Sequence, residues 1–239
     1  MSYAPLMIKE MTRKGVVSGS FSGAVLLADI IGFTSRFERM TGLGAEGAEL
    51  ISREVSSTLS AVASICAEFR GFPVSFAGDA VTIVFPGGLK DASLAAQKIN
   101  LLAGGEFLPL RSSIGEGQVV WDAIPMDGWT FYSFQGAAVR QALLPGQGTT
   151  LEQKPWSGQK YECVPVGSED LPANGFISPE LFADGIKNEF RQVINIFLSL
   201  ENRSGNNCPR EFQELVLNTA EEVGGFVSGL EAGKEDYHI

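Results

Sequence analysis

Two aspartates lie where an apolar, strand-like run breaks into a glycine-containing turn. Asp29 follows Leu26-Leu27-Ala28, and Asp79 follows Phe76-Ala77-Gly78. Carboxylate oxygens are ligands that Mg²⁺ accepts in proteins. A pair of divalent ions ~3.5–4 Å apart can hold the attacking and leaving oxygens of a phosphoryl transfer. The two motifs therefore predict a two-metal phosphoryl-transfer site at the ends of two strands.

The residues after Asp29 predict a phosphate-binding turn. They run Ile-Ile-Gly-Phe-Thr and then enter an expected helix at 35–40. Gly32 lets the backbone approach a ligand closely, and the amides of Phe33, Thr34 and Ser35 would face an anion at the positive end of the helix dipole. Each motif also has a simpler alternative. An Asp or Thr before a helix can be an N-cap, and Gly-Asp after a strand can be a hairpin turn.

The elements that must position these residues alternate between strand and helix. Their order, β-α-β-β-α-β, predicts an α+β domain of ferredoxin-like or palm type, with an antiparallel-rich sheet and helices packed on it. Topology of this kind does not decide function. The expected strands are 21–30, a hairpin over 71–86 with Gly78-Asp79 at its tip, 108–124, 129–134 and 160–166, and the expected helices are 45–70, 91–102 and 136–144.

Together the two motifs resemble the catalytic domain of class III nucleotidyl cyclases, most of all the first catalytic module of soluble, bicarbonate-type adenylyl cyclases. The resemblance rests on Ala-Asp-Ile-Ile-Gly-Phe-Thr at 28–34 and Glu-Phe-Arg-Gly-Phe-Pro-Val-Ser-Phe-Ala-Gly-Asp-Ala at 68–80, and it covers residues 18–166. It implies that the ribose 3′ oxygen attacks the α-phosphorus and that pyrophosphate leaves. Such chemistry depends on positioning and charge neutralisation.

The same resemblance implies a role for each residue of the two motifs. Asp29 and Asp79 are the catalytic residues and hold two Mg²⁺ or Mn²⁺ ions, and the carbonyl of Ile30 adds a metal ligand. The amides of Gly32, Phe33 and Thr34 hold the β and γ phosphates.

The C-terminal part predicts a second copy of the first elements. A strand at 190–200 and a helix at 210–223 are followed by Gly-Phe-Val-Ser-Gly at 225–229, in the place of Gly-Phe-Pro-Val-Ser at 71–75. We expect a cyclase module at 1–170, a linker at 171–186 and a partial second module, strand-helix-strand, at 187–239. The chain would then be part of a longer tandem protein.

In this repeat, Ser199-Leu200 stands where Asp29 does, and Lys234 stands near the position of Asp79. The resemblance to the second module of soluble adenylyl cyclases implies that Lys234 meets the polyphosphate. The alternative is a solvated surface lysine near a chain end.

Three positions depart from the family pattern. Ser75 stands where a lysine contacts adenine, Arg140 replaces an asparagine for the ribose, and Leu144 replaces the arginine that stabilises the developing charge. Losing such a donor typically costs ~10²–10³ in rate. We therefore expect weak or no activity from residues 1–239 without a complementary module, supplied in cis or by a homodimer partner.

Arg140 has two interpretations, a contact to an anion at a domain interface or a structural pair with an acidic neighbour. Leu143 occupies the position of the basic residue that binds bicarbonate in the soluble cyclases, which argues against bicarbonate regulation.

Composition excludes several classes of function. The net charge is −10 and no basic cluster exceeds a pair such as Arg13-Lys14, which argues against a nucleic-acid partner. The three cysteines are widely spaced, as in proteins of a reducing compartment. The single histidine, His238, excludes a Ser-His-Asp triad in the body of the chain. No signal peptide is visible and no apolar run approaches the ~20 residues of a membrane span, so we expect a cytoplasmic protein.

The sequence thus predicts an adenylate cyclase, a phosphorus–oxygen lyase of signal transduction that converts ATP, with GTP possible, to the cyclic nucleotide and pyrophosphate. The alternative is a degenerate cyclase-homology module with a regulatory or dimerising role, which Ser75, Arg140 and Leu144 favour. A diguanylate cyclase shares the palm topology but needs a Gly-Gly-Asp/Glu-Glu-Phe turn that this chain lacks.

Overall fold

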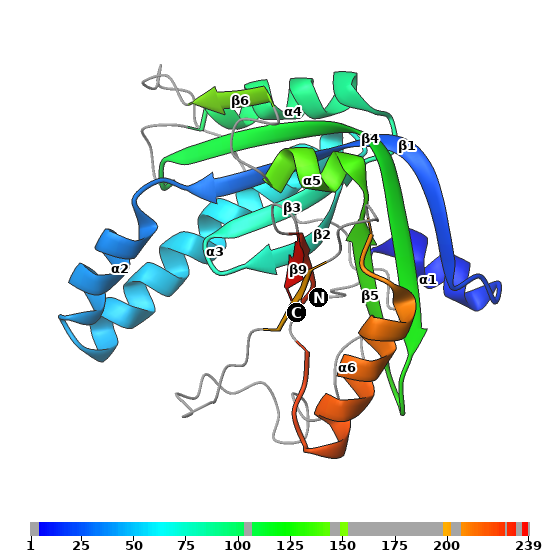
Figure 1. The fold of residues 1–239 in the computed structure, drawn as a ribbon. Coiled ribbons are helices and arrows are strands. Elements are labelled where there is room, and N and C mark those ends of the chain that lie inside the picture. Colours follow the sequence, from blue (N-terminus) through cyan, green and yellow to red (C-terminus); the bar gives the residue numbers. More distant parts are fainter. Residues whose placement is uncertain are drawn as a thin grey trace. The chain divides into compact units, whose positions relative to one another are not determined.

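The structure is a computed structural model, and it describes residues 5–102, 107–143, 149–152, 198–201, 207–227, 229–232 and 236–238. Within these ranges helices and antiparallel strands alternate, which confirms the predicted α+β class (Figure 1). None of the described helices is both long and apolar enough to span a membrane. The helices are α1 Leu6–Arg13, α2 Phe33–Thr41, α3 Ala45–Glu68, α4 Leu89–Asn100, α5 Ala137–Leu143 and α6 Arg210–Glu222. The strands are β1 Ser18–Ile30, β2 Phe72–Ala77, β3 Ala80–Phe85, β4 Leu110–Pro125, β5 Thr130–Gln135, β6 Thr149–Glu152, β7 Ser199–Glu201, β8 Glu231–Ala232 and β9 Asp236–His238.

The chain divides into two compact units, and strands β1 and β4 contribute residues to both. One unit comprises Ser22–Gly117 and Gln141–Gly167. The other comprises Met1–Phe21, Gln118–Arg140 and Ser168–Ile239. The candidate metal residues Asp29 and Asp79 both belong to the first of these.

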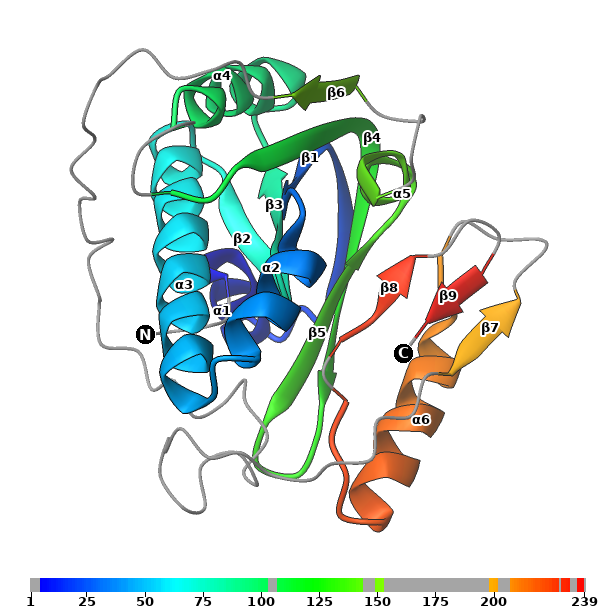
Figure 2. The same ribbon diagram turned by 90° about the vertical axis from the view of Figure 1, so that its left-hand side faces the viewer.

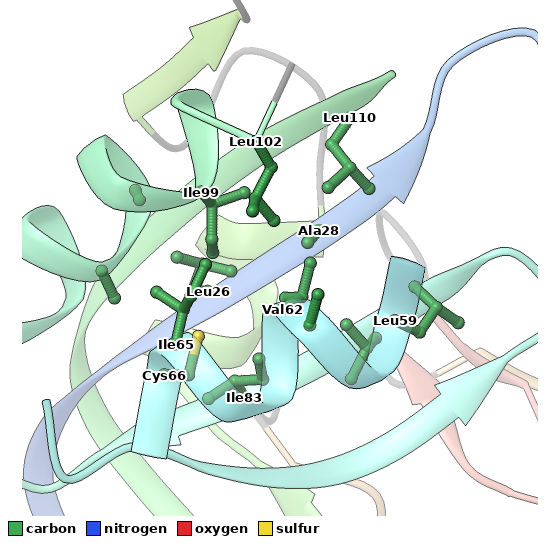
Figure 3. Close-up of a cluster of buried hydrophobic side chains, with 14 of the residues drawn as sticks. Leu26, Ala28, Leu59, Val62, Ile65, Cys66, Ile83, Ile99, Leu102 and Leu110 are labelled. Atoms are coloured by element: carbon green, nitrogen blue, oxygen red, sulfur yellow. The ribbon is translucent and has the colours of Figure 1, made fainter. Parts of the chain in front are cut away.

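In the unit that holds Asp29 and Asp79, the strand order is β2-β3-β1-β4. β3 pairs antiparallel with both β2 and β1, and β6 pairs antiparallel with β4. Helices α3 and α4 cover one side of this sheet because their apolar residues recur every three or four positions and so form one face. Figure 3 shows the resulting core, with Leu59, Val62, Ile65 and Cys66 of α3 and Ile99 of α4 packed around Leu26 and Ala28 of β1 and Ile83 of β3.

In the other unit, the second half of β4 pairs with β5, from Val120 opposite Gln135 to Pro125 opposite Thr130. Helix α6 packs on this hairpin through Leu217, which joins Ile124 and Phe131 in a small apolar cluster. The same unit holds a three-stranded sheet of order β7-β9-β8, in which the strands lie side by side (Figure 2).

A buried polar network also joins α6 to β5 in this unit. The hydroxyl of Ser133 donates to Gln213 Oε1 at 3.0 Å, and Gln213 Nε2 donates to the carbonyl of Cys208 at 3.1 Å. The amide of Cys208 in turn donates to Gln135 Oε1 at 2.5 Å. Each of these groups therefore has the partner that burial of a polar group requires.

Most predicted elements are present within a few residues of their expected bounds, but three expectations differ. Helix α1 had no predicted counterpart, and β6 lies in a region, 146–155, that reads as a polar turn. The strand expected after the helix at 210–223 starts later than its sequence suggests, because 225–227 belong to no strand and the next strand is β8. The expected strand at 160–166, and residues 190–197 of the strand expected at 190–200, lie outside the described residues.

Candidate metal and phosphate site

The two candidate metal ligands meet at one end of the β1–β3 pair. Asp29 of β1 lies opposite Ala80, the first residue of β3, and Asp79 immediately precedes Ala80. The N–H of Ile30 donates to the carbonyl of Asp79 at 3.1 Å, which extends the pairing by one bond. Antiparallel pairing thus brings together two carboxylates that are far apart in the sequence.

The turn that carries Asp79 depends on the glycine before it. β2 and β3 are joined by the two residues Gly78 and Asp79, and Gly78 has φ 60°. A positive φ at the first central position is what a type II′ hairpin turn requires. A Cβ at Gly78 would meet nothing within 4 Å, so the requirement is conformational and not steric. The glycine fixes where the backbone of Asp79 leaves the strand.

The two carboxylates interact electrostatically. The pKa of Asp79 is raised above 3.8, first by partial burial and then by the negative charge of Asp29, while a hydrogen bond from its own backbone amide acts in the opposite direction. Repulsion between like charges within a few ångströms is relieved by a bound cation. The pair is therefore an anionic site suited to a divalent ion.

Arg111 is a member of this site that the sequence patterns do not reveal. Its Nη2 lies 2.7 Å from Oδ2 of Asp29, and the Arg111 side chain is 57% exposed. Arg111 comes from β4, the neighbour of β1 in the sheet. A single arginine in an expected strand carries no local signal, so only the order of the strands identifies it.

The segment predicted to bind phosphate has a left-handed glycine followed directly by a helix. Gly32 adopts the left-handed conformation, with φ 70° and ψ 22°, and helix α2 begins at Phe33. No side chain among the described residues caps this helix, and its first turn contains no acidic residue. The amides of Phe33 and Thr34 therefore lie at the uncapped positive end of a nine-residue helix. Figure 1 shows α2 following directly from the end of β1.

The donor set has the chemistry that a hard divalent cation prefers. Two carboxylates and the carbonyl of Ile30 are all oxygen donors, which Mg²⁺ and Mn²⁺ favour over nitrogen or sulfur. Among the described residues, no three His, Cys, Asp or Glu side chains cluster as a protein-only metal cage. Backbone oxygen, water and substrate phosphate would have to complete the coordination shell, as is common for Mg²⁺.

The positions that depart from the family pattern lie outside this cluster or outside the described residues. Ser75 is exposed on β2, opposite Thr82, next to an irregularity in the β2–β3 register. Arg140 lies on α5 in the other unit, and its backbone N–H donates to the carbonyl of Gly136 at 3.0 Å. Leu144 and Lys234 are not among the described residues.

Comparison with known proteins gives matches only among solved structures. No protein-family model and no curated protein matches this sequence. The adenylyl cyclase CyaB from P. aeruginosa superposes with a TM-score of 0.40 and 20% identity, over 52% of this chain and 70% of that chain. A bacterial light-regulated adenylyl cyclase gives a TM-score of 0.45 at 16% identity, over 59% of this chain.

A third match is the guanylate cyclase domain of RhGC from Catenaria anguillulae in complex with GTP. It has a TM-score of 0.45 and 18% identity, and the match covers 55% of this chain and 76% of that domain. This chain spans only 45% of the light-regulated cyclase. These three structures are of adenylyl and guanylyl cyclases, and the likeness to each is distant.

Proposed function

We propose that this chain carries the metal-binding half of a nucleotidyl cyclase site, which converts ATP to cyclic AMP and pyrophosphate. The main observation in support of this proposal is the register of β1 and β3, which brings Asp29 next to the turn that contains Asp79. The uncapped start of α2 follows Asp29 within five residues and supplies amides for phosphate. Asp29 and the candidate phosphate-binding amides thus lie on one stretch of backbone, and the pairing of β1 with β3 adds Asp79 beside it.

In this proposal Asp29, Asp79 and the carbonyl of Ile30 hold two Mg²⁺ or Mn²⁺ ions. The ions would neutralise the negative charge of the triphosphate and would activate the ribose hydroxyl. Gly32, Phe33 and Thr34 bind the β and γ phosphates through their amides, as helix N-termini bind anions.

Arg111 adds a partly exposed positive charge to the same site. Its guanidinium pairs with Asp29 and is more than half exposed, so it can exchange this carboxylate for a phosphate oxygen. Arg111 would then bind substrate and leave Asp29 to the metal. ATP is assigned from the resemblance to soluble adenylyl cyclases, and GTP is the alternative substrate because Ser75 replaces the lysine that contacts adenine.

We also propose that residues 187–239 begin a second cyclase-like module, after a first module at 1–170 and a linker at 171–186. The order β7-β9-β8 repeats the order β1-β3-β2, with antiparallel pairing throughout. Lys234 falls between β8 and β9 as Asp79 falls between β2 and β3. A lysine there would serve the polyphosphate instead of a metal.

The strand register refines which residue replaces Asp29 in the repeat. If Lys234 corresponds to Asp79, then Asp236 corresponds to Val81. Asp236 pairs with Glu201 and Val81 pairs with Ala28, so the position of Asp29 falls on residue 202, an asparagine, and not on Ser199-Leu200.

A regulatory or dimerising module is the second candidate function. Ser75, Arg140 and Leu144 remove the base, ribose and transition-state contacts of the family pattern from this half of the site. Such a module could bind a nucleotide and metal without turning the nucleotide over.

Thermal unfolding with Mn²⁺ and a nonhydrolysable ATP analogue tests the metal site. At a ligand concentration of about 100 Kd, binding stabilises the native state by about 2.7 kcal/mol. Asp29→Asn and Asp79→Asn should abolish the stabilisation, whereas Asp127→Asn, at an exposed aspartate of the β4–β5 turn, should retain it. No stabilisation of the unmodified protein would contradict the metal site.

Turnover separates the cyclase from the regulatory alternative. We expect little cyclic AMP from residues 1–239 alone and a large increase when a complementary cyclase module is added. Appreciable turnover by residues 1–239 alone would contradict the need for that module. Binding without turnover in either case would favour the regulatory function.

A further inference from the structure

Two polar side chains of α3, Glu54 and Thr58, lie one helical turn apart, and each is linked through other residues to the segment that holds the candidate metal and phosphate turn at 29–34. Residues four apart on a helix share one face. The side chain of Thr58 is fully buried. Its hydroxyl donates to the carbonyl of Glu54 at 2.8 Å and accepts the N–H of Leu108 at 3.0 Å.

The contact to Leu108 continues to the metal turn through one more residue. The carbonyl of Pro109 accepts the N–H of Ile31 at 2.8 Å. Proline has a fixed φ, so the short Leu108-Pro109 segment is stiff and transmits the position of Thr58 to Ile31. Ile31 lies between Ile30, whose carbonyl is a candidate metal ligand, and Gly32, which opens the phosphate turn.

Glu54 holds the other end of the turn through Arg36 of α2. Both carboxylate oxygens accept from the guanidinium, with Nε to Oε2 at 3.0 Å and Nη2 to Oε1 at 2.9 Å. The pair is partly shielded, because the side chains of Arg36 and Glu54 are 35% and 26% exposed. A bidentate pair of this kind fixes orientation as well as distance. The first turn of α2, whose amides are the candidate phosphate donors, is therefore attached to α3.

We propose that Glu54 and Thr58 are positioning residues, which hold the turn at 29–34 in the geometry that binds metal and phosphate. This inference rests on the proposed function of that turn. Donors that are fixed in advance need no reorganisation when the ligand binds, so they bind it more tightly. Residues that orient metal ligands from behind typically change metal affinity by about 10–100-fold when they are removed.

Thr58→Val in the full chain tests the link from Thr58 through Leu108 and Pro109 to Ile31, because valine keeps the shape of threonine and removes the hydroxyl. In the metal-free protein we expect the amides of Leu108 and Ile31 to exchange roughly tenfold faster, as when a buried hydrogen bond is lost. In calorimetric titration with Mn²⁺ and a nonhydrolysable ATP analogue, we expect roughly tenfold weaker binding. Thr58→Ser should restore both properties.

Thr12→Val is the matched control for this variant. The Thr12 hydroxyl also donates to a carbonyl four residues earlier, that of Ile8 at 2.9 Å, but Thr12 lies on α1 and has no described contact with Leu108. It should leave metal affinity unchanged. Unchanged exchange at Ile31 in Thr58→Val, or unchanged metal affinity despite faster exchange, would overturn the role of Thr58.

Glu54→Gln tests the link from Glu54 to Arg36, and it keeps the inference testable if Thr58→Val does not fold. We expect weaker binding of the nucleotide analogue by roughly tenfold, because the charged pair that orients α2 is lost. Glu49→Gln is its control, since Glu49 also pairs with an arginine, Arg53, at 2.8 Å on the same helix but with both side chains more than 70% exposed. Equal binding by Glu54→Gln and Glu49→Gln would overturn the role of Glu54.

The two proposals fail in different ways. If the unmodified protein binds no Mn²⁺ with the analogue, the proposed function of the turn is wrong, and the positioning role falls with it. If the unmodified protein binds and the Thr58 and Glu54 variants bind equally well, only the positioning role is wrong.

Discussion

Two segments of this chain share a strand–helix–hairpin topology, β1-α3-β2-β3 and β7-α6-β8-β9, and only the first has an additional helix, α2, between the strand and the long helix among the described residues. In each, the strand before the helix pairs antiparallel with the second strand of the hairpin. The helices also end alike. In α3 the N–H of Gly71 donates to the carbonyl of Cys66 at 2.9 Å, and in α6 the N–H of Gly225 donates to that of Ala220 at 2.7 Å. The same backbone solution is therefore used twice.

The two segments differ in the side chains at corresponding turns. The first hairpin carries Asp79 at its tip, opposite the strand end that carries Asp29. In the sequence of the second segment, Lys234 stands between the residues of β8 and those of β9. The left-handed residue that ends the helix is Arg70 in the first segment and Gly224 in the second, with φ 62° and 71°. Topology is thus shared while charge and turn chemistry are not, so the chemistry of each segment must be read from its turns.

Giving the first hairpin the residue of the second should have the largest effect. Asp79→Lys should abolish Mn²⁺ binding, a loss of about 100-fold or more, because one ligand is removed and a positive charge is introduced. Calorimetric titration measures this, and Asp127→Lys serves as the control. Retained Mn²⁺ affinity in Asp79→Lys would show that the hairpin tip is not the metal site.

Truncation of one apolar residue in each helix compares the two cores. Ile65→Ala of α3 should reduce the free energy of unfolding by about 3–5 kcal/mol, since Ile65 belongs to the large core of Figure 3. Leu217→Ala of α6 should cost about 2 kcal/mol, because its buried cluster is much smaller and can relax around the cavity. Urea unfolding of both variants measures the difference. Equal losses would contradict the distinction between the cores.

Asp79 should give the first hairpin its own contribution to the pH dependence of stability, apart from that of Asp122, whose pKa is also raised by burial. The folded protein holds the proton of Asp79 more tightly than the unfolded chain does, so the free energy of unfolding falls as pH rises from 3.8 through the raised pKa. Metal affinity should rise over the same interval, because the ion competes with that proton. Urea midpoints across this range measure the slope, which Asp79→Asn should reduce, whereas the contribution of Asp122 should remain.

The pH range over which stability falls, here called the pH window, depends on what raises the pKa of Asp79, and a second variant tests this. Asp29→Asn removes the negative charge that raises the pKa of Asp79, so the window should move to lower pH. An unmoved window would show that the two carboxylates do not interact.

Substitutions at the C-terminal ends of α3 and α6 should have the smallest effects on stability. Gly224→Ala should cost about 1 kcal/mol, because a Cβ is strained at φ 71° although nothing crowds it. Arg70→Gly should change stability less, since relief of the same strain is offset by loss of the 2.8 Å ion pair between the exposed Arg70 side chain and the largely buried Asp91. Thermal unfolding of the two variants measures the contrast, and a large loss for Arg70→Gly would show that the Asp91 pair outweighs the strain.

Local patterns in the sequence by themselves determine several features of this protein. The apolar spacing of α3 predicts a helix because one turn takes 3.6 residues, and Gly78-Asp79 predicts a hairpin because glycine alone adopts a positive φ without strain. The free amides after Gly32 likewise follow from a strand that runs into a helix. These features depend on neighbours along the chain.

Contacts between distant residues were decided only by the tertiary structure. β6 exists because Thr149–Glu152 pair with Arg111–Ile114 of β4, although its own sequence reads as a turn. The ion pair between Arg111 and Asp29 requires β4 to lie beside β1. The hydrogen bond from Leu108 to Thr58 requires α3 to pack against the segment that precedes β4. A sequence specifies each residue's local preference, whereas such pairings depend on which strands and helices pack together.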